Sequence, residues 1–281
     1  MTPLAKALWY INSHYREELS LEDIAHCAGV SRFHLLRVFG NATGRSMMKY
    51  VRALRLCEAA RRLAQGSEDI LSVAIDSGYA SHEAFTRAFR EQFGVTPESV
   101  RKQRHVNNLP LLEQFTMSTL PAISLEPPRF QDGNVLLLAG LSERYTADQC
   151  GANIPAQWQK FGPHLGHVPG QLGSVAYGVC YNFDEAGNMD YLCGVEVTEF
   201  SDLPHDFAHL RITPQRYAVF FHAQHISAIR STWHAIWNEW LPQSGYELAD
   251  APFFERYDER FDPRNGNGGV ELWIPIHAKK A

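Results

Sequence analysis

The chain has 281 residues, a composition typical of globular proteins and a formal net charge of −5. This length favours two domains of roughly 100–200 residues each. No run approaches the roughly 18–20 apolar residues of a membrane-spanning helix, and the start lacks the charged and apolar segments of a signal peptide, so we expect a cytoplasmic protein.

The charges are unevenly distributed along the chain. Residues 1–107 contain 15 Lys and Arg against 11 Asp and Glu, a net of +4, which leaves 11 against 20, a net of −9, for residues 108–281. This asymmetry predicts a first domain that faces DNA and an acidic second domain that attracts cationic ligands.

The cysteines predict neither disulfides nor metal binding. They are an odd number, are widely spaced and include no Cys-x-x-Cys pair, so we expect no zinc site and no cofactor. They are Cys27, Cys57, Cys150, Cys180 and Cys193.

Residues 1–107 are predicted to be helical, because apolar residues recur every three or four positions. Within them, residues 21–39 are typical of a helix-turn-helix motif: Ala25 allows two helices to cross closely, and Gly29 allows the positive φ of a tight turn. The predicted N-caps and core positions are Ser20, Ser31, Ile24, Val30, Leu35 and Val38.

A second copy of this motif begins near Ile70, 49 residues after the first, with a turn that is one residue longer. Its matching positions are Ala74, Gly78, the N-cap Ser81 and the buried stripe of Phe85, Ala88 and Phe89. Thr96-Pro97-Glu98 then predicts the start of a further helix. An arginine-rich helix between the two copies favours DNA binding over general core packing.

Side chains that point away from these cores are the predicted base readers. Arginine can donate two hydrogen bonds to guanine, Phe and Leu can contact a thymine methyl group, and Glu can accept from cytosine. The candidates are Arg32, Phe33, Leu36 and Arg37 in the first motif, and His82, Glu83, Thr86 and Arg87 in the second. The alternative for either helix alone is packing against a neighbour or a solvated surface.

The pattern of apolar residues changes after a linker at residues 105–110, and strand-like runs alternate with helical ones from there on. One strand, one helix and one hairpin occur twice in order, which predicts an α+β domain over residues 113–281, built from two pseudo-symmetric units around a groove. The first unit comprises residues 134–145, 153–166, 173–183 and 189–200. The second comprises residues 215–223, 226–241, 253–260 and 270–277.

Two glutamates lie in apolar strands of the second unit. Because an unpaired carboxylate is costly to bury, Glu255 and Glu271 predict a function, and if both line the groove they would bind a lipophilic cation through charge and cation–π contact. The alternatives are that Glu255 pairs with a neighbouring arginine, Arg256 or Arg260, and that Trp237 packs in the core.

The residues from Gly78 to Pro97, GYASHEAFTRAFREQFGVTP, resemble the signature of the AraC/XylS family of transcription regulators, and the resemblance extends over residues 4–105. It implies seven helices whose two recognition helices enter successive major-groove segments. It implies DNA contacts at the candidate positions named above, with the exception of Arg32. Members of the family often have a polar residue where this chain has Leu36.

Residues 113–278 resemble the GyrI-like small-molecule-binding domains through segments such as Phe254-Glu-Arg-Tyr257 and Glu271-Leu-Trp-Ile-Pro-Ile276. The resemblance implies a site for lipophilic cations at Glu255, with Glu271 second and Trp237 and Tyr177 as walls. Together the two resemblances imply an activator of stress or multidrug-efflux genes that a hydrophobic or cationic small-molecule effector modulates. Its expected partners are double-stranded promoter DNA and RNA polymerase, and we expect a monomer on DNA.

Two other functions remain open for the second domain. Some GyrI-like proteins are hydrolases, in which Glu255 or Glu271 would act as a general base, and a ligand-free module that contacts other proteins is the second alternative. No nucleophile elbow, metal-ligand spacing or phosphate loop supports an enzyme, and we therefore predict that the chain is not one.

Overall fold

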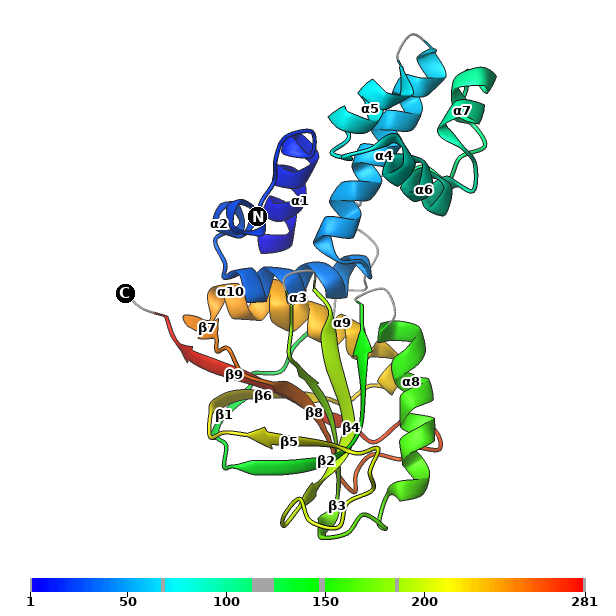
Figure 1. The fold of residues 1–281 in the computed structure, drawn as a ribbon. Coiled ribbons are helices and arrows are strands. Elements are labelled where there is room, and N and C mark those ends of the chain that lie inside the picture. The colour runs from blue at the N-terminus through cyan, green and yellow to red at the C-terminus, as the bar shows by residue number, and fades with distance from the viewer. Residues whose placement is uncertain (1, 67–68, 113–123, 147–149, 185–186, 280–281) are drawn as a thin grey trace.

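The computed structural model describes the chain except for residues 1, 67–68, 113–123, 147–149, 185–186 and 280–281. Residues 3–103 form helices only, and we call them the helical head. Residues 129–278 form an antiparallel sheet with helices, and we call them the sheet domain (Figure 1). This confirms the predicted fold class. No described helix combines the length and the apolar character needed to span a bilayer.

The described part of the helical head contains the seven expected helices. Ser20 and Ser31 cap the first motif's helices, and Ser81 caps the second recognition helix, as predicted. Gly29 and Gly78 turn with φ of 71° and 85°, which side chains larger than hydrogen disfavour. The helices are α1 (Pro3–His14), α2 (Leu21–Ala28), α3 (Arg32–Thr43), α4 (Met47–Gln65), α5 (Ile70–Asp76), α6 (His82–Phe93) and α7 (Pro97–Gln103).

The two motifs have separate cores joined by α4. In the second motif, Phe85, Phe89 and Phe93 pack with residues of α4, α5 and α7. In the first motif, Leu35 and Val38 of α3 belong to a core that continues into the sheet domain. The first motif and the sheet domain are therefore packed as one unit. Helix α3 lies on α9 (Ile229–Ala235) and the π-helical segment η3 (Ile236–Trp240) of the sheet domain (Figure 1).

The sheet domain contains the duplicated unit that the sequence predicts. Its elements are β1 (Arg129–Asp132), β2 (Leu136–Tyr145), α8 (Cys150–Phe161), η1 (Gly162–His164), β3 (Gln171–Tyr181), β4 (Met189–Val197), β5 (Ala208–Ile212), β6 (Arg216–His222), η2 (Ile226–Ala228), α9 (Ile229–Ala235), the π-helical segment η3 (Ile236–Trp240), α10 (Leu241–Gln243), β7 (Tyr246–Leu248), β8 (Phe253–Tyr257) and β9 (Val270–Ala278).

The strand order β1-β6-β9-β8-β3-β4-β2-β5 reveals the internal symmetry, with β7 paired to β9 off this path. The hairpin β3–β4 beside β2 mirrors the hairpin β8–β9 beside β6, and the two units meet where β3 pairs with β8. The edge strands β1 and β5 extend β6 and β2 in the same way. The sequence pattern predicts neither strand, because four or five partly polar residues give no clear alternation.

We expect Gly29→Ala to destabilise the chain by about 1–2 kcal/mol, because a Cβ disfavours the left-handed backbone even where there is room for it. The measurement is urea unfolding followed by circular dichroism. Gly162→Ala is the matched control, since Gly162 has open space and no positive φ. Equal losses in both variants would show that the conformation of the turn is not the cause.

Candidate functional site

The predicted DNA-reading side chains of α6 lie on an open surface. His82, Glu83 and Arg87 are exposed, and Thr86 is half-buried. Hydrogen bonds from its own backbone N–H and from the Ser81 hydroxyl lower the pKa of Glu83, so this carboxylate also supports the start of the helix. The predicted reading face of the second motif is therefore open to solvent.

Two of the corresponding side chains of α3, Leu36 and Arg37, are buried, and the expectation that they point outward to DNA is wrong for this structure. Arg32 is exposed and Phe33 is half-buried, but Leu36 and Arg37 are only 7% and 6% exposed. The inward residues, such as Leu35, are buried in the head as predicted. The opposite face of α3 is covered by the sheet domain, which sequence periodicity does not reveal.

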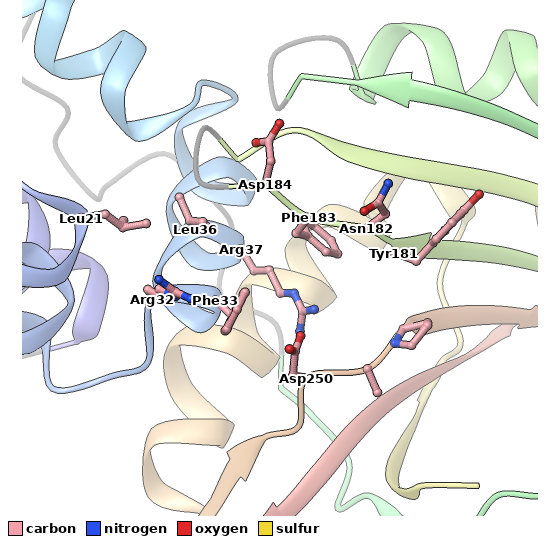
Figure 2. A pocket seen from close by; sticks show the side chains of 12 residues that line it. Leu21, Arg32, Phe33, Leu36, Arg37, Tyr181, Asn182, Phe183, Asp184 and Asp250 are labelled. Carbon is pink, nitrogen blue, oxygen red and sulfur yellow. The ribbon is translucent and has the colours of Figure 1, made fainter. Parts of the chain in front are cut away.

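Arg37 makes the most specific of these contacts. Its Cζ lies 4.5 Å from the ring centre of Phe183 and 4.7 Å from that of Phe253. Its Nε and Nη1 are buried without a hydrogen-bond partner among the described residues. Burial lowers the pKa of Arg37 to about 10, while the charge of Asp250 acts in the opposite direction. Figure 2 shows the guanidinium pointing toward Asp250.

A polar contact also holds α3 on the sheet domain. The imidazole of His34 lies 3.1 Å from the backbone oxygen of Trp237, in the π-helical segment. Burial lowers the pKa of His34 to about 4, so it is neutral at physiological pH and donates through Nε2. A Cβ placed on Gly187, in the turn between β3 and β4, would lie 3.7 Å from Leu36.

A cavity of about 570 Å³ lies beside this contact, between the helical head and the sheet domain (Figure 2). The head contributes polar and apolar side chains of α2 and α3, and the sheet domain contributes the end of β3 and the segment before β8. The lining residues are Leu21, Arg32, Phe33, Leu36, Arg37, Tyr181, Asn182, Phe183, Asp184, Asp250, Ala251 and Pro252.

In the sheet domain, Glu255 of β8 is a half-buried carboxylate surrounded by neutral donors. Its Oε2 accepts hydrogen bonds from the hydroxyls of Tyr191, at 3.0 Å, and Tyr257, at 2.7 Å, and its Oε1 accepts from the indole of Trp233, at 3.1 Å. Within the described part of the chain it has no ion-pair partner. Burial raises the pKa of Glu255, and the three hydrogen bonds offset this only in part.

Aromatic rings extend this cluster toward α8. The indole of Trp158 donates to Tyr191 at 3.1 Å, and its ring lies 5.1 Å from that of Tyr257. Gly178 of β3 lies beneath Glu255, where a Cβ would displace both the carboxylate and the Tyr191 hydroxyl. A glycine inside a strand marks a close approach, so Gly178 was an available signal for Tyr191, which was not among the predicted site residues.

Glu271 does not share this site. The register pairs Glu255 with Leu272 and Arg256 with Glu271, which places the two glutamates on opposite faces of the sheet. The groove with both acids is therefore a wrong expectation. It failed because alternation within one strand fixes faces only relative to that strand, and the offset between β8 and β9 was unknown.

Glu271 is instead a buried and fully compensated charge. Arg129 holds it with two hydrogen bonds, at 2.8 and 3.1 Å, Arg260 adds one at 3.0 Å, and Trp273 adds one at 3.1 Å. Burial alone would raise its pKa, but these partners lower the pKa of Glu271 to about 2. A carboxylate with such partners has no charge left for a cationic ligand.

The two predicted wall residues also lie apart from Glu255. Tyr177 pairs with Arg256 in the sheet and therefore lies on the face of Glu271. Trp237 is fully buried and stacks on Trp233 at 5.4 Å, so it supports the site from behind, as the core-packing alternative has it.

No three described His, Cys, Asp or Glu side chains come together as a metal site would require. Among the described residues, Cys27, Cys57, Cys180 and Cys193 form no disulfide. The side chain of Cys150 lies outside the described residues.

Comparisons with known proteins fit this division. Residues 127–277 match the GyrI-like small molecule binding domain, and residues 24–103 match a helix-turn-helix domain. The right origin-binding protein of Escherichia coli K12 is 36% identical over 124 residues, 42% of this chain and 43% of that protein, so this chain spans less than half of that relative. The transcriptional regulator BrlR of Pseudomonas aeruginosa is 27% identical over 272 residues, 92% and 96% of the two chains.

These relatives are named as a transcriptional regulator and an origin-binding protein, in line with the expectation that the chain is not an enzyme. Among solved structures, SAV2435 bound to tetraphenylphosphonium is similar with a TM-score of 0.46 and 22% identity, over 54% of this chain and 94% of that one.

We expect Glu271→Gln to lower the free energy of unfolding at pH 7 by about 3 kcal/mol, since it removes a charge that three arginines face. A carboxylate with a lowered pKa stabilises the fold above its unfolded pKa, and this contribution is lost as the pH falls toward 2. The difference in unfolding free energy between the variant and wild type, measured by urea unfolding, should therefore shrink as the pH falls from 5 to 2.

Glu259→Gln is the control for this measurement, because Glu259 is an exposed glutamate in the segment between β8 and β9. A Glu271→Gln chain as stable as wild type at pH 7 would contradict the role given to the arginine cluster.

Proposed function

Because this chain belongs to the GyrI-like small-molecule-binding family and is an AraC-family DNA-binding regulator, we propose that it activates stress or multidrug-efflux genes when a hydrophobic cation binds its sheet domain. Double-stranded promoter DNA and RNA polymerase are its proposed macromolecular partners, and it acts on DNA as a monomer. We assign DNA binding to residues 1–107 and effector binding to residues 113–281.

One observation carries the choice of ligand: Glu255 is an uncompensated carboxylate in an aromatic setting. Its three donors are neutral, and the rings of Trp158 and Tyr257 stand beside it. A lipophilic cation would supply the missing positive charge and place apolar surface against these rings. An anion would meet repulsion from the same carboxylate.

The contrast with Glu271 strengthens this assignment. Both glutamates lie in adjacent strands, yet Glu271 already has three arginine partners. Only Glu255 would gain an ion pair from a cationic ligand. The acidic balance of residues 108–281 acts in the same direction at longer range.

We expect calorimetric titration of the full chain with tetraphenylphosphonium to show saturable binding that weakens at least tenfold in Glu255→Gln, because a desolvated charge pair is lost. Triphenylphosphine oxide serves as a neutral aromatic analogue and should bind both chains equally. Glu259→Gln, in the same region but exposed, should bind like wild type.

If the wild-type chain bound none of a panel of lipophilic cations, the proposed effector class would be contradicted. Binding that is equally strong in Glu255→Gln would place the ligand elsewhere in the chain. Turnover of an ester substrate that is lost in Glu255→Gln would favour the hydrolase alternative instead.

Binding of the cation should also depend on pH. Burial raises the pKa of Glu255, so this carboxyl takes up its proton at a higher pH than an ordinary glutamate. Since only the ionised form attracts a cation, affinity for tetraphenylphosphonium should fall as the pH drops through that pKa. Affinity for the neutral analogue should stay constant, and a fall of both together would indicate unfolding rather than titration.

For the DNA contact, we expect Arg87→Ala on the open surface of α6 to weaken specific binding by about 1–3 kcal/mol if Arg87 contacts a guanine. Fluorescence anisotropy with a duplex selected from a random pool provides the measurement. Arg264→Ala, an exposed arginine of the sheet domain, is the control and should leave affinity unchanged. An equal loss on all sequences would assign Arg87 to the phosphate backbone.

A further inference from the structure

We propose that the sheet domain is a brake on the first recognition helix: it covers the DNA-reading face of α3, and the Arg37 contact with Phe183 and Phe253 is the latch. The proposal rests on the proposed function in one respect, namely that α3 and α6 bind DNA. It adds that the chain described here presents only α6, and that α3 has to leave the sheet domain before both motifs can engage.

Steric exclusion follows from the dimensions of the two partners. A helix with its side chains is roughly 10–12 Å across, and the DNA major groove is roughly 12 Å wide, so a helix that reads bases must be free of protein on its reading face. Leu36 and Arg37 on that face are more than nine-tenths buried by the sheet domain. DNA and the sheet domain therefore compete for the same surface of α3.

The two motifs of one chain serve as an internal comparison. In α6, the equivalent residues His82, Glu83 and Arg87 are exposed, and no part of the described sheet domain covers them. Both helices begin with a serine N-cap and follow a glycine turn, so their local structures match. The two helices differ in their surroundings, since α3 packs on α9 and the π-helical segment of the sheet domain.

Ring contacts stabilise the latch, but they leave part of the Arg37 guanidinium without hydrogen bonds. The guanidinium of Arg37 gains two aromatic contacts, yet its Nε and Nη1 have no hydrogen-bond partner among the described residues. Burying such a charge costs part of what the ring contacts contribute. A phosphate or guanine would satisfy these N–H groups, so DNA offers Arg37 a better environment than the sheet domain does.

The latch also touches the proposed effector site. The ring of Phe253 lies against Arg37 on one side and 5.0 Å from the ring of Trp233 on the other, and Trp233 donates to Glu255. A ligand that pairs with Glu255 therefore contacts the hydrogen-bond partner of Trp233, and the ring of Trp233 packs against Phe253 of the latch. It releases α3 only if it binds the open chain more tightly than the closed one.

Phe183→Ala in the full chain tests the brake, because Phe183 belongs to the sheet domain and lies outside the DNA-reading set. The probe is a 40-base-pair duplex selected from a random pool by the wild-type chain. We expect the variant to bind it about tenfold more tightly, with a footprint that grows from one major-groove segment to two. The salt dependence should steepen by roughly one unit per added phosphate contact.

Phe221→Ala is the matched control. Phe221 is also a partly exposed phenylalanine of the sheet domain with an arginine over its ring, Arg260 at 4.8 Å, but it lies on β6 and not at α3. This variant should keep the affinity, footprint and salt slope of wild type. Gains of equal size in both variants would reduce the effect to general loosening of the sheet domain and overturn the brake.

Asp250→Asn keeps the test valid if Phe183→Ala fails to fold, since Asp250 is exposed and its loss removes the charge that Arg37 faces. It should tighten DNA binding in the same direction by a smaller factor. DNA binding by the wild-type chain that matches both folded variants in affinity and footprint overturns the brake alone. Absence of DNA binding in every variant, at low salt, would overturn the proposed function instead.

Discussion

The contact between α3 and the sheet domain determines how the rest of this molecule can work. One face of α3 completes the core of its own motif through residues such as Leu35, and the opposite face packs on α9, the π-helical segment and the turn after β3. A helix buried on both faces is common inside a protein, but it is unusual for a helix expected to read DNA. If α3 reads DNA as proposed, this packing links that contact to any change in the sheet domain.

The sheet domain separates two kinds of buried charge by the pleat of its strands. Glu271 lies on the face where Arg129, Arg256 and Arg260 meet, and it stabilises the junction of β8, β9 and the first edge strand. Glu255, one strand away, lies on the helix-covered face with only neutral donors. The same residue type therefore has a structural role on one face, whereas on the other face its charge has no cationic partner among the described residues.

Local chemistry made much of the fold predictable. The serine caps, the two glycine turns and the aromatic stripe of α6 follow from rules that act within a few residues, and each is confirmed. The duplicated unit was visible because its strands and helices recur in order. The edge strands β1 and β5 were missed because pairing, not local pattern, defines them.

The sites were less predictable, because they depend on contacts between distant residues. His34 and Trp237 are 203 positions apart, and nothing in the sequence near α3 signals the partner that covers it. The faces of Glu255 and Glu271 depend on the register between β8 and β9, where one residue of offset reverses the outcome. Glu255 itself was found from its apolar surroundings, which is a local property.

The length of α4 has a mechanical consequence. Its 19 residues form one helix, roughly 28 Å long at 1.5 Å per residue, with the first motif packed at its start and the second at its end. If the helix moved as a rigid rod about its start beside α3, its far end would move most. A tilt of about 10° at the pivot would move the far end by about 5 Å on the same geometry. A small adjustment beneath Arg37 would thus be amplified into a change of reach for the distant motif.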